Sequence, residues 1–407
     1  QRQMCIRDRY EGDGASGVNA QPINNGLDLA GEGGLTIIKY RDGQFGTGHY
    51  IYDTERSNAS LALNSDGPEE TPDDRFEFTS TGFKVKVDGG SAINTNTYKY
   101  VSWSFTKAPG FCDVVTYSGT GSVQNIAHSL DSVPGMMWVR CLIGTHDWEV
   151  YHRNAHLLSP AEKSLHLNQD HKANTDTTVW NNTEPTSTHF TVGTNSNVNQ
   201  NGHTYIAYIF AHDDARFGTN EDESIIKCGT YTSYGNVRDI NVGFEPQWLM
   251  VKGINMTGRD WVIYDNMRGA VVGSNLGIAL KANSNNAEGG SNVGFNSTGF
   301  TLSDASNETN SNATEYIYMA IRRPNKPPET ASDVFFVNFT YNDAQFTNAG
   351  FPVDFAITAN RDHTYGNILG TRLTGKNYLY TALTSWRDPM GYDLSLIHIS
   401  EPTRRLI

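Results

Sequence analysis

The chain has 407 residues and a formal net charge of -13 at pH 7, with an isoelectric point near 5.3. No cluster of Lys and Arg interrupts this acidity, which argues against a nucleic-acid partner and against binding to an anionic membrane surface. No apolar stretch reaches the roughly 18 residues that a membrane-spanning helix needs, so no membrane insertion is expected. The abundance of Gly, Asn, Thr, Tyr and Phe favours short strands joined by polar turns.

Both ends of the chain are interpreted as foreign to the protein. Met4–Arg9 ("MCIRDR") and Leu394–Ile399 ("LSLIHI") back-translate into reverse-complementary strings that resemble the transposon end used in sequencing libraries. We therefore treat residues 1–9 and 394–407 as translated adaptor and expect both to lie outside any packed core. The genuine chain, about 10–393, is then expected to be a fragment.

The main signal is an internal repeat. An Asn-x-Asn element followed by a tyrosine that opens an apolar run occurs three times, at Tyr100, Tyr205 and Tyr316. The first Asn always stands six residues before the tyrosine, and the tyrosines are 105 and 111 residues apart. Because Asn bonds its own main chain and tolerates left-handed backbone, this element is predicted to end one strand and aim the next. Further landmarks recur in the same order: Lys39, Arg140 and Lys252; Tyr52, Tyr151 and Tyr264; Phe83, Phe190 and Phe300.

Short runs typical of strands separate these landmarks. In chain order they include "FKVKV" at 83–87, "FTVGT" at 190–194, "YIAYIF" at 205–210 and "WVIY" at 261–264, all bounded by turn residues. No window shows a convincing helical period. The sequence therefore predicts an all-β fold of tandem β-sandwich (jelly-roll or lectin-like) repeats of about 105–114 residues.

Pro-rich, Gly-rich and acidic stretches divide the chain into segments. The expected order is adaptor 1–9, first repeat 10–107, second repeat 108–214, acidic linker 215–223, third repeat 224–324, Pro-rich linker 325–332, truncated fourth repeat 333–393 and adaptor 394–407.

No catalytic motif is present in the sequence, which lacks a Gly-x-Ser-x-Gly elbow, a Walker loop and a His-Glu-x-x-His pair. Glycoside hydrolysis needs two carboxyl groups, and no Asp or Glu is matched in all three repeats. We therefore expect no enzymatic activity and no cofactor.

No metal site is predicted either. Cys112, Cys141 and Cys228 have neither disulfide nor zinc spacing, and Cys141 aligns with Gly253, so they are interpreted as buried thiols. The histidines of the second repeat are interpreted as solvated loop residues: His128, His146, His152, His156, His166, His171 and His189.

One aromatic residue is a candidate for ligand binding. Trp180 lies in the polar stretch "VWNNTEPTS" beside Asn181 and Asn182, and the aligned loops of the other repeats lack this Trp. An aromatic ring beside amides can hold a sugar by stacking and directed hydrogen bonds. The predicted ligand-binding residues are therefore Trp180, Asn181 and Asn182, and the alternative is a Trp that plugs the end of the sandwich.

The second repeat resembles a domain found in phage particles. The run from "APGFCDVVTYSGTG" (108–121) through "WEVYHR" (148–153) to "NGHTYIAYIFA" (201–211) resembles the repeated domain of tail-fibre-like and other virion structural proteins from marine bacteriophages. The segments 24–42, 351–357 and 372–383 resemble flanking parts of the same proteins, and the resemblance covers about 10–385. It implies a β-rich, extracellular virion appendage and transfers no catalytic residue.

These observations predict a tail-fibre-like virion structural protein that takes part in attachment to a host surface. The expected partners are a host cell-surface glycan or protein, other virion tail proteins, and further copies of the chain in a homo-oligomer, a trimer. Each repeat is expected to bind weakly, because repeated sites on one appendage raise the effective concentration. A pure structural spacer and, less favoured, a tail-associated glycan depolymerase are the alternatives.

Overall fold

The structure is a computed structural model, and the chain divides into two compact units, Gln1–Asn325 and Lys326–Ile407. The predicted all-β fold is confirmed in the described residues. The Pro-rich linker 325–332 and the adaptor segment 394–407 lie outside them. The structure describes residues 5–17, 19–42, 48–70, 74–87, 93–218, 221–270, 277–290, 292–303, 305–322, 335–337, 355–359, 367–371, 378–380 and 386–387.

The first compact unit contains three antiparallel β-sandwiches that correspond to the three sequence repeats, and each has one larger sheet. In spatial order, the larger sheet of the first repeat contains β1 (Cys5–Glu11), β8 (Lys99–Thr106), β3 (Gly34–Tyr40), β4 (His49–Asp53) and β5 (Ser60–Ala62). That of the second repeat contains β14 (Asn174–Thr175), β13 (Lys163–His166), β12 (Glu149–His152), β11 (Pro134–Cys141), β16 (Thr204–Ala211) and β9 (Cys112–Ser118). That of the third repeat contains β17 (Ile226–Thr232), β25 (Glu315–Arg322), β19 (Pro246–Gly253), β20 (Val262–Asp265), β21 (Ile278–Lys281) and β22 (Gly289–Gly290).

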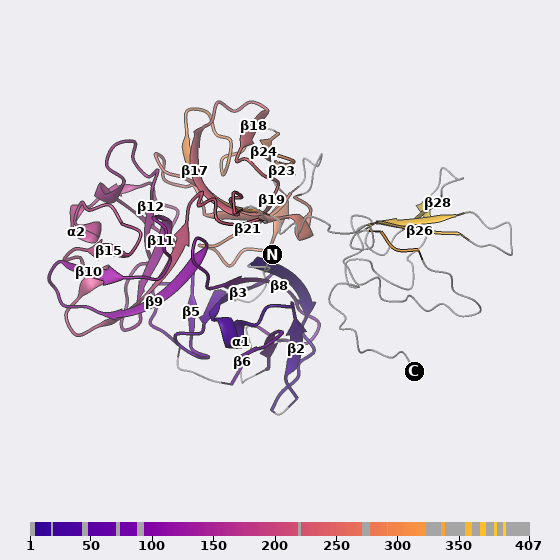
Figure 1. Cartoon of the computed structure of the whole chain (residues 1–407), viewed down its shortest axis with the longest axis horizontal. Helices are drawn as coiled ribbons and strands as arrows, with labels where there is room; N and C mark the ends of the chain where they lie inside the picture. Colours follow the sequence, from indigo (N-terminus) through magenta and orange to yellow (C-terminus); the bar gives the residue numbers. More distant parts are fainter. Residues whose placement is uncertain are drawn as a thin grey trace. The chain divides into compact units, whose positions relative to one another are not determined.

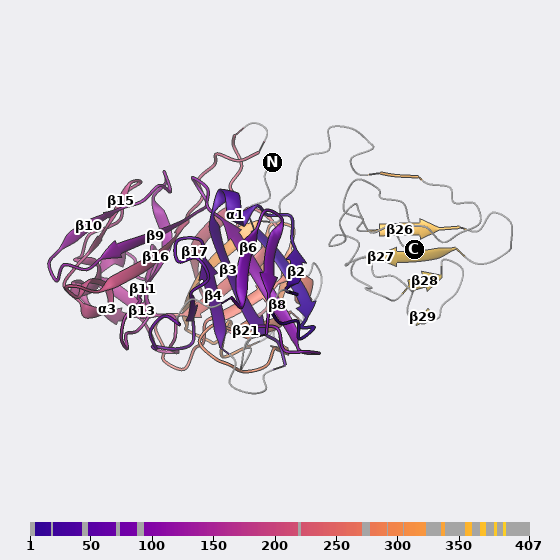
Figure 2. The ribbon, with the colours of Figure 1, turned by 90° about the horizontal axis from the view of Figure 1, so that it is seen from below.

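A smaller sheet covers one face of each larger sheet, on the outside of the three lobes in Figure 1. The smaller sheet of the first repeat contains β2 (Gln21–Asn24), β7 (Gly82–Val85) and β6 (Phe76–Thr79). That of the second repeat contains β10 (Gln124–Ala127) and β15 (His189–Val192), and that of the third contains β18 (Arg238–Asn241), β24 (Gly299–Leu302) and β23 (Val293–Asn296). The described helices are single turns: α1 (Leu29–Glu32), η1 (Pro160–Glu162), α2 (Thr177–Trp180), α3 (Ser196–Asn199) and η2 (Asn266–Arg268). Figure 2 shows β8, β3 and β4 of the first repeat side by side.

The second compact unit contains a four-stranded antiparallel sheet among its described residues. Its strands, in spatial order, are β26 (Phe355–Thr358), β27 (Ile368–Thr371), β28 (Tyr378–Tyr380) and β29 (Trp386–Arg387).

The repeated tyrosines occupy equivalent ladder positions, as predicted. Tyr100, Tyr205 and Tyr316 each pair with a tyrosine of the neighbouring first strand, and the paired rings stack with centroids 5.0, 5.2 and 5.1 Å apart. The hydroxyl of each repeated tyrosine also accepts a backbone N–H from the Asn-rich loop five residues earlier. The tyrosine therefore ties the closing strand to the loop that precedes it.

The repeated asparagines have a structural role, as expected, but they bond a different loop and not their own main chain, and none of the three has left-handed backbone. The first Asn of each element, at 94, 199 and 310, is buried, and its side-chain oxygen accepts a hydrogen bond from the loop after the first strand of its repeat. Because a buried amide is costly without partners, these bonds fix the path of both loops.

The larger sheets are buried on both faces. In β19, Leu249 and Val251 face the smaller sheet of the third repeat, whereas Trp248 and Met250 belong to a core shared with the other two repeats. Because successive side chains of a strand point to opposite faces of the sheet, neighbouring residues of β19 lie in different cores. Strands buried on both faces read as continuous apolar runs, which explains why the central strands show little polar alternation.

The three repeats close into a ring with pseudo-threefold symmetry. One ladder position, at or immediately before the start of β4, β12 and β20, sends a ring N–H or ring nitrogen to a backbone carbonyl of another repeat. The contacts are Trp148 Nε1 to Ala62 O at 3.0 Å, Trp261 Nε1 to His166 O at 2.8 Å, and His49 Nδ1 with Ala282 O at 3.1 Å. The second repeat thus binds the first, the third binds the second, and the first binds the third.

A second set of contacts links the three repeats in the same order. Each contact comes from the Lys or Arg that stands in an otherwise apolar strand of its repeat. Lys39, Arg140 and Lys252 are buried at equivalent positions, and each donates to a backbone carbonyl of another repeat. The acceptors are Ser284 O for Lys39, Gly67 O for Arg140 and Gln169 O for Lys252. Backbone bonds from Glu288 to Arg41, from Glu69 to Leu142 and from Ala173 to Ile254 accompany them.

The N-terminal segment differs from the expectation. Residues 5–11 form β1, which pairs antiparallel with β8 at the sheet position that β9 and β17 occupy in the other repeats. Residues 1–9 were expected to lie outside any packed core, but the backbone of 5–9 is part of the larger sheet of the first repeat. An edge strand pairs through backbone N–H and C=O groups that every non-proline residue carries, so this pairing does not depend on the origin of the residues.

Candidate functional site

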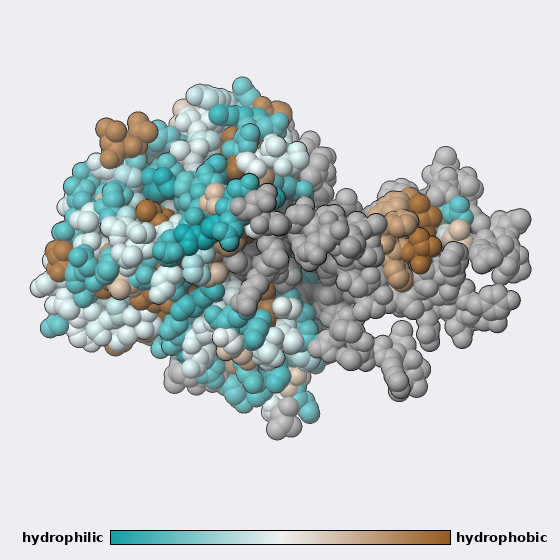
Figure 3. All heavy atoms as spheres, viewed as in Figure 1, coloured by the Kyte–Doolittle hydropathy of each residue, from teal (hydrophilic) through white to brown (hydrophobic). Residues whose placement is uncertain are grey.

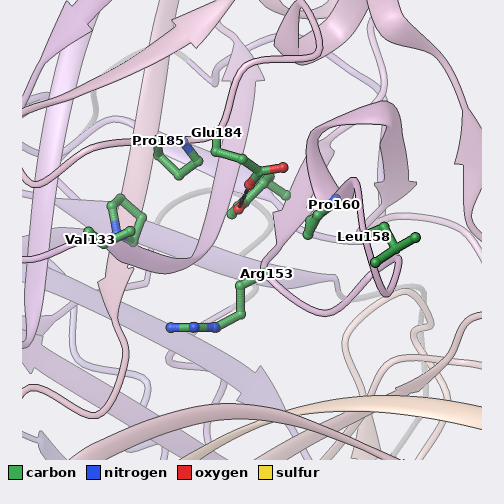
Figure 4. A pocket seen from close by; sticks show the side chains of 8 residues that line it. Val133, Arg153, Leu158, Pro160, Glu184 and Pro185 are labelled. Carbon is green, nitrogen blue, oxygen red and sulfur yellow. Dashed lines mark hydrogen bonds between the residues drawn. The ribbon is translucent and has the colours of Figure 1, made fainter.

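A pocket lies at one end of the second repeat, where β11 begins and β12 ends. Its volume is about 230 Å³, and Figure 4 shows the side chains that surround it. Segment 158–160, which leads into η1, and the loop after α2 supply the other walls. The lining residues are Val133, Pro134, Tyr151, Arg153, Leu158, Pro160, Glu184 and Pro185.

A hydrogen-bonded pair fixes one side of this pocket. The Tyr151 hydroxyl donates to Glu184 Oε2 at 2.5 Å, and the Ala161 backbone N–H donates to Glu184 Oε1 at 2.9 Å. Burial raises the pKa of Tyr151, and its bond to the Glu184 carboxylate raises that pKa further, so the phenol keeps its proton at neutral pH. Both carboxylate oxygens are thus held in place by donors of the protein itself.

Arg153 supplies the positive charge of the pocket. Its side chain is partly buried, and among the described residues no carboxylate or carbonyl is paired with its guanidinium. In Figure 4 the guanidinium points away from the Glu184 carboxylate. A guanidinium presents planar, paired N–H donors that match a carboxylate or sulfate group. The pocket therefore has an available donor set for an anionic group.

Exposed apolar side chains flank the pocket. Leu158, which lines it, is 84% exposed, and the adjacent Leu157 is 92% exposed. On the face of the first compact unit shown in Figure 3, most of the described surface is hydrophilic or neutral and hydrophobic patches are small. Two adjacent leucines in solvent provide apolar contact area beside the cationic group.

The structure places the predicted binding residues behind and beside this pocket. Trp180 ends α2 and is 1% exposed, so its ring lies in the core and does not present a face for stacking. It meets the Tyr151 ring edge to face, with centroids 6.0 Å apart, and thereby supports the pocket floor. Asn181 and Asn182 are exposed and adopt left-handed backbone, which Asn tolerates.

Sequence reasoning missed Arg153, Tyr151 and Glu184 as members of one site. A signal for Arg153 exists in the alignment of the repeats, because the same position holds Thr54 in the first repeat and Asn266 in the third. An arginine confined to one copy indicates a role specific to that copy. No sequence spacing brings Glu184 to Tyr151, because the loop after α2 determines that contact.

The fold and the pocket define an all-β protein of three pseudosymmetric sandwiches, one of which carries a candidate binding site. The chain belongs to the family described as a domain of unknown function, DUF7483, whose model matches residues 9–324. The match spans all three repeats. A search of curated proteins finds no match to the sequence. Among the residues that the structure describes, no helix has both the length and the apolar character needed to cross a bilayer.

Proposed function

We propose that the protein is a non-catalytic attachment protein of a bacteriophage tail-fibre-like virion appendage, and that its second repeat binds an acidic glycan of the host surface. The observation that carries this proposal is the Arg153 guanidinium, which has no carboxylate or carbonyl partner among the described residues and lies in a pocket bordered by Tyr151, two prolines and an exposed leucine. A sugar ring offers apolar C–H faces to such walls, and a carboxylate or sulfate substituent pairs with the guanidinium.

The composition of the pocket supports binding over glycan cleavage. Among the described residues that line it, Glu184 is the single carboxylic acid, and both of its oxygens already accept hydrogen bonds from the protein. Glycoside hydrolases need a second carboxyl group at a defined distance. A spacer alone has no use for an unpaired, partly buried cation, because burial without a partner costs free energy.

The resemblance to tail-fibre-like proteins supports the placement on a virion, where other tail proteins and further copies of the chain, as a trimer, are the proposed partners. A single small pocket gives weak binding, and several copies on one particle raise the effective concentration of the site. The three repeats share one core, so avidity comes from copies of the whole chain and not from repeats strung along it.

The test is affinity electrophoresis of the full chain through gels that contain a polyuronate, a sulfated dextran or neutral dextran. We expect retardation by an acidic polymer, loss of retardation in Arg153→Ala, and no change in Arg238→Ala. Arg238 is an exposed arginine of the third repeat, so its replacement removes the same charge away from the pocket.

Three outcomes contradict the proposal. An equal loss of retardation in Arg153→Ala and Arg238→Ala indicates that the polymer is attracted unspecifically by positive charge. Absence of retardation by both acidic polymers favours the spacer function, and shortening of a polymer by the wild-type chain favours a depolymerase.

A further inference from the structure

A second cluster of reactive side chains lies at the opposite end of β11 from the pocket. Cys141 ends β11, His146 lies in the loop that leads to β12, and His203 immediately precedes β16. The ligand-capable atoms of these three residues all lie within 4.8 Å of one another. Cys141 is buried, whereas both histidines are partly exposed, so solvent reaches one side of the cluster.

The strand register brings the cysteine and one histidine together. Cys141 pairs with Tyr205 across the ladder of β11 and β16, and His203 stands two residues before Tyr205. Residues two apart on a strand project to the same face, so His203 lies diagonally across from Cys141. The resulting distance from Cys141 Sγ to His203 Nδ1 is 3.4 Å.

This arrangement fits a tetrahedral metal ion. Zinc bond lengths of about 2.3 Å to sulfur and about 2.0–2.1 Å to nitrogen give a sulfur–nitrogen edge of roughly 3.6 Å in a tetrahedron. The Cys141–His203 distance of 3.4 Å is close to this length, and the ligand atoms of all three residues lie within 4.8 Å of one another. One thiolate with two imidazoles favours zinc over magnesium or calcium, which prefer oxygen ligands.

A second layer of contacts orients His146. Its Nδ1 lies 3.4 Å from Asn197 Oδ1, and Asn197 Nδ2 donates to Glu149 Oε1 at 2.7 Å. Because the amide nitrogen of Asn197 is engaged by Glu149, its oxygen faces the histidine and accepts the Nδ1 proton. Nε2 of His146 then carries the lone pair, the arrangement that outer-layer partners impose on metal-bound histidines.

The cluster is specific to the second repeat. The ladder position of Cys141 holds Tyr40 in the first repeat and Gly253 in the third. In the first repeat Tyr40 stacks on Tyr98, which stands at the position of His203, with ring centroids 4.8 Å apart. The second repeat thus has a thiol and an imidazole where the first has an aromatic stack.

From this geometry we infer that Cys141, His146 and His203 form a binding site for one zinc ion, with a water molecule as the fourth ligand. The site lies at the junction of the first two repeats. There the backbone N–H of His146 donates to Asp66 O at 3.0 Å, and the backbone N–H of Glu69 donates to Leu142 O at 3.0 Å. Bound zinc fixes the 142–146 loop against segment 66–69 and thereby stabilises the closed ring.

Cobalt titration of the chelator-treated full chain tests the inference. We expect a thiolate-to-cobalt charge-transfer absorption that saturates at one equivalent and disappears when zinc is added. The absorption is lost in Cys141→Ser and retained in Cys112→Ser, which removes another buried thiol. Because Cys141 is buried and its replacement also perturbs packing, His146→Gln, in a partly exposed loop, is the second variant and should weaken cobalt binding at least tenfold.

Thermal unfolding gives an independent readout. Since an ion that binds only the folded chain stabilises it by mass action, added zinc should raise the melting temperature of the wild type more than that of His146→Gln. A folded wild-type chain without a zinc-displaceable thiolate–cobalt absorption overturns the inference. The same absorption in Cys141→Ser, or an equal zinc shift in His146→Gln, also overturns it.

Discussion

Replacement of Arg268 by alanine perturbs an ion pair of the third repeat that is buried against the first repeat. Arg268 Nε donates to Asp265 Oδ2 at 2.7 Å, and both side chains are fully buried. The same carboxylate oxygen accepts the indole N–H of Trp103, from the first repeat, at 3.0 Å. Removal of the guanidinium leaves a buried carboxylate without its cation, which should cost about 3–5 kcal/mol of unfolding free energy.

The second repeat shows how the cost can be relieved. There, His152 and Ala155 occupy the positions of Asp265 and Arg268. His152 is neutral, because burial lowers its pKa to about 3, and its Nε2 donates to Tyr318 O at 3.1 Å while its Nδ1 accepts the Asn154 N–H. The repeat thus satisfies this buried position without any charge.

The double variant Asp265→His/Arg268→Ala should therefore be more stable than the two single changes predict together. Asp265→His alone leaves a buried guanidinium without its carboxylate and should cost about 3–5 kcal/mol. The double variant removes both charges and should cost about 1–3 kcal/mol, the penalty for the Trp103 N–H that loses its acceptor.

The assay is urea unfolding of the full chain, followed by tryptophan fluorescence, for the wild type, both single variants and the double variant. The double-mutant cycle isolates the interaction between the two positions. If the cost in the double variant equals the sum of the single costs, the buried pair is not the feature that links these residues, and the reasoning is refuted.

Three further predictions use the same unfolding assay. Trp180→Ala should lose about 3–5 kcal/mol because it empties a buried ring site, and unchanged stability would contradict its place in the core. His152 has a pKa of 6.5 when unfolded and about 3 when folded, so stability is full above pH 6.5 and falls toward pH 3. His152→Gln should flatten this dependence, and the exposed His156→Gln should not. Residues 108–214 alone should show no cooperative transition, because they lack the other walls of the shared core; a sharp transition would argue against that core.

The sequence predicted those features that depend on local pattern. The spacing of Tyr100, Tyr205 and Tyr316 predicted the length of the repeat and the strand that carries each tyrosine. This succeeded because in every repeat the tyrosine stacks on a tyrosine of the first strand. The repeated cation at Lys39 and Arg140 was also visible. A charge held in an apolar strand through several copies indicates a buried acceptor, and the acceptors proved to lie in other repeats.

The closed ring and the sites at its second repeat could not be predicted in this way. Trp148 contacts a carbonyl 86 positions away in sequence, and the contact depends on how whole sandwiches pack. Cys141 and His203 are 62 positions apart and fit no metal-binding spacing, so each was interpreted alone. Trp180 was a candidate for sugar stacking because its neighbours are polar, but one helical turn directs its ring inward, which agrees with the alternative of a Trp that plugs the end of the sandwich.

Isothermal titration of the full chain with a short acidic oligosaccharide, such as a uronate trimer, tests the proposed function most directly, because it counts sites. If the second repeat alone binds, the titration should saturate at one site per chain, and Arg153→Ala should abolish the heat of binding while Arg238→Ala preserves it. Three equal sites per chain, no heat of binding in the wild type, or undiminished binding in Arg153→Ala would contradict the proposed site.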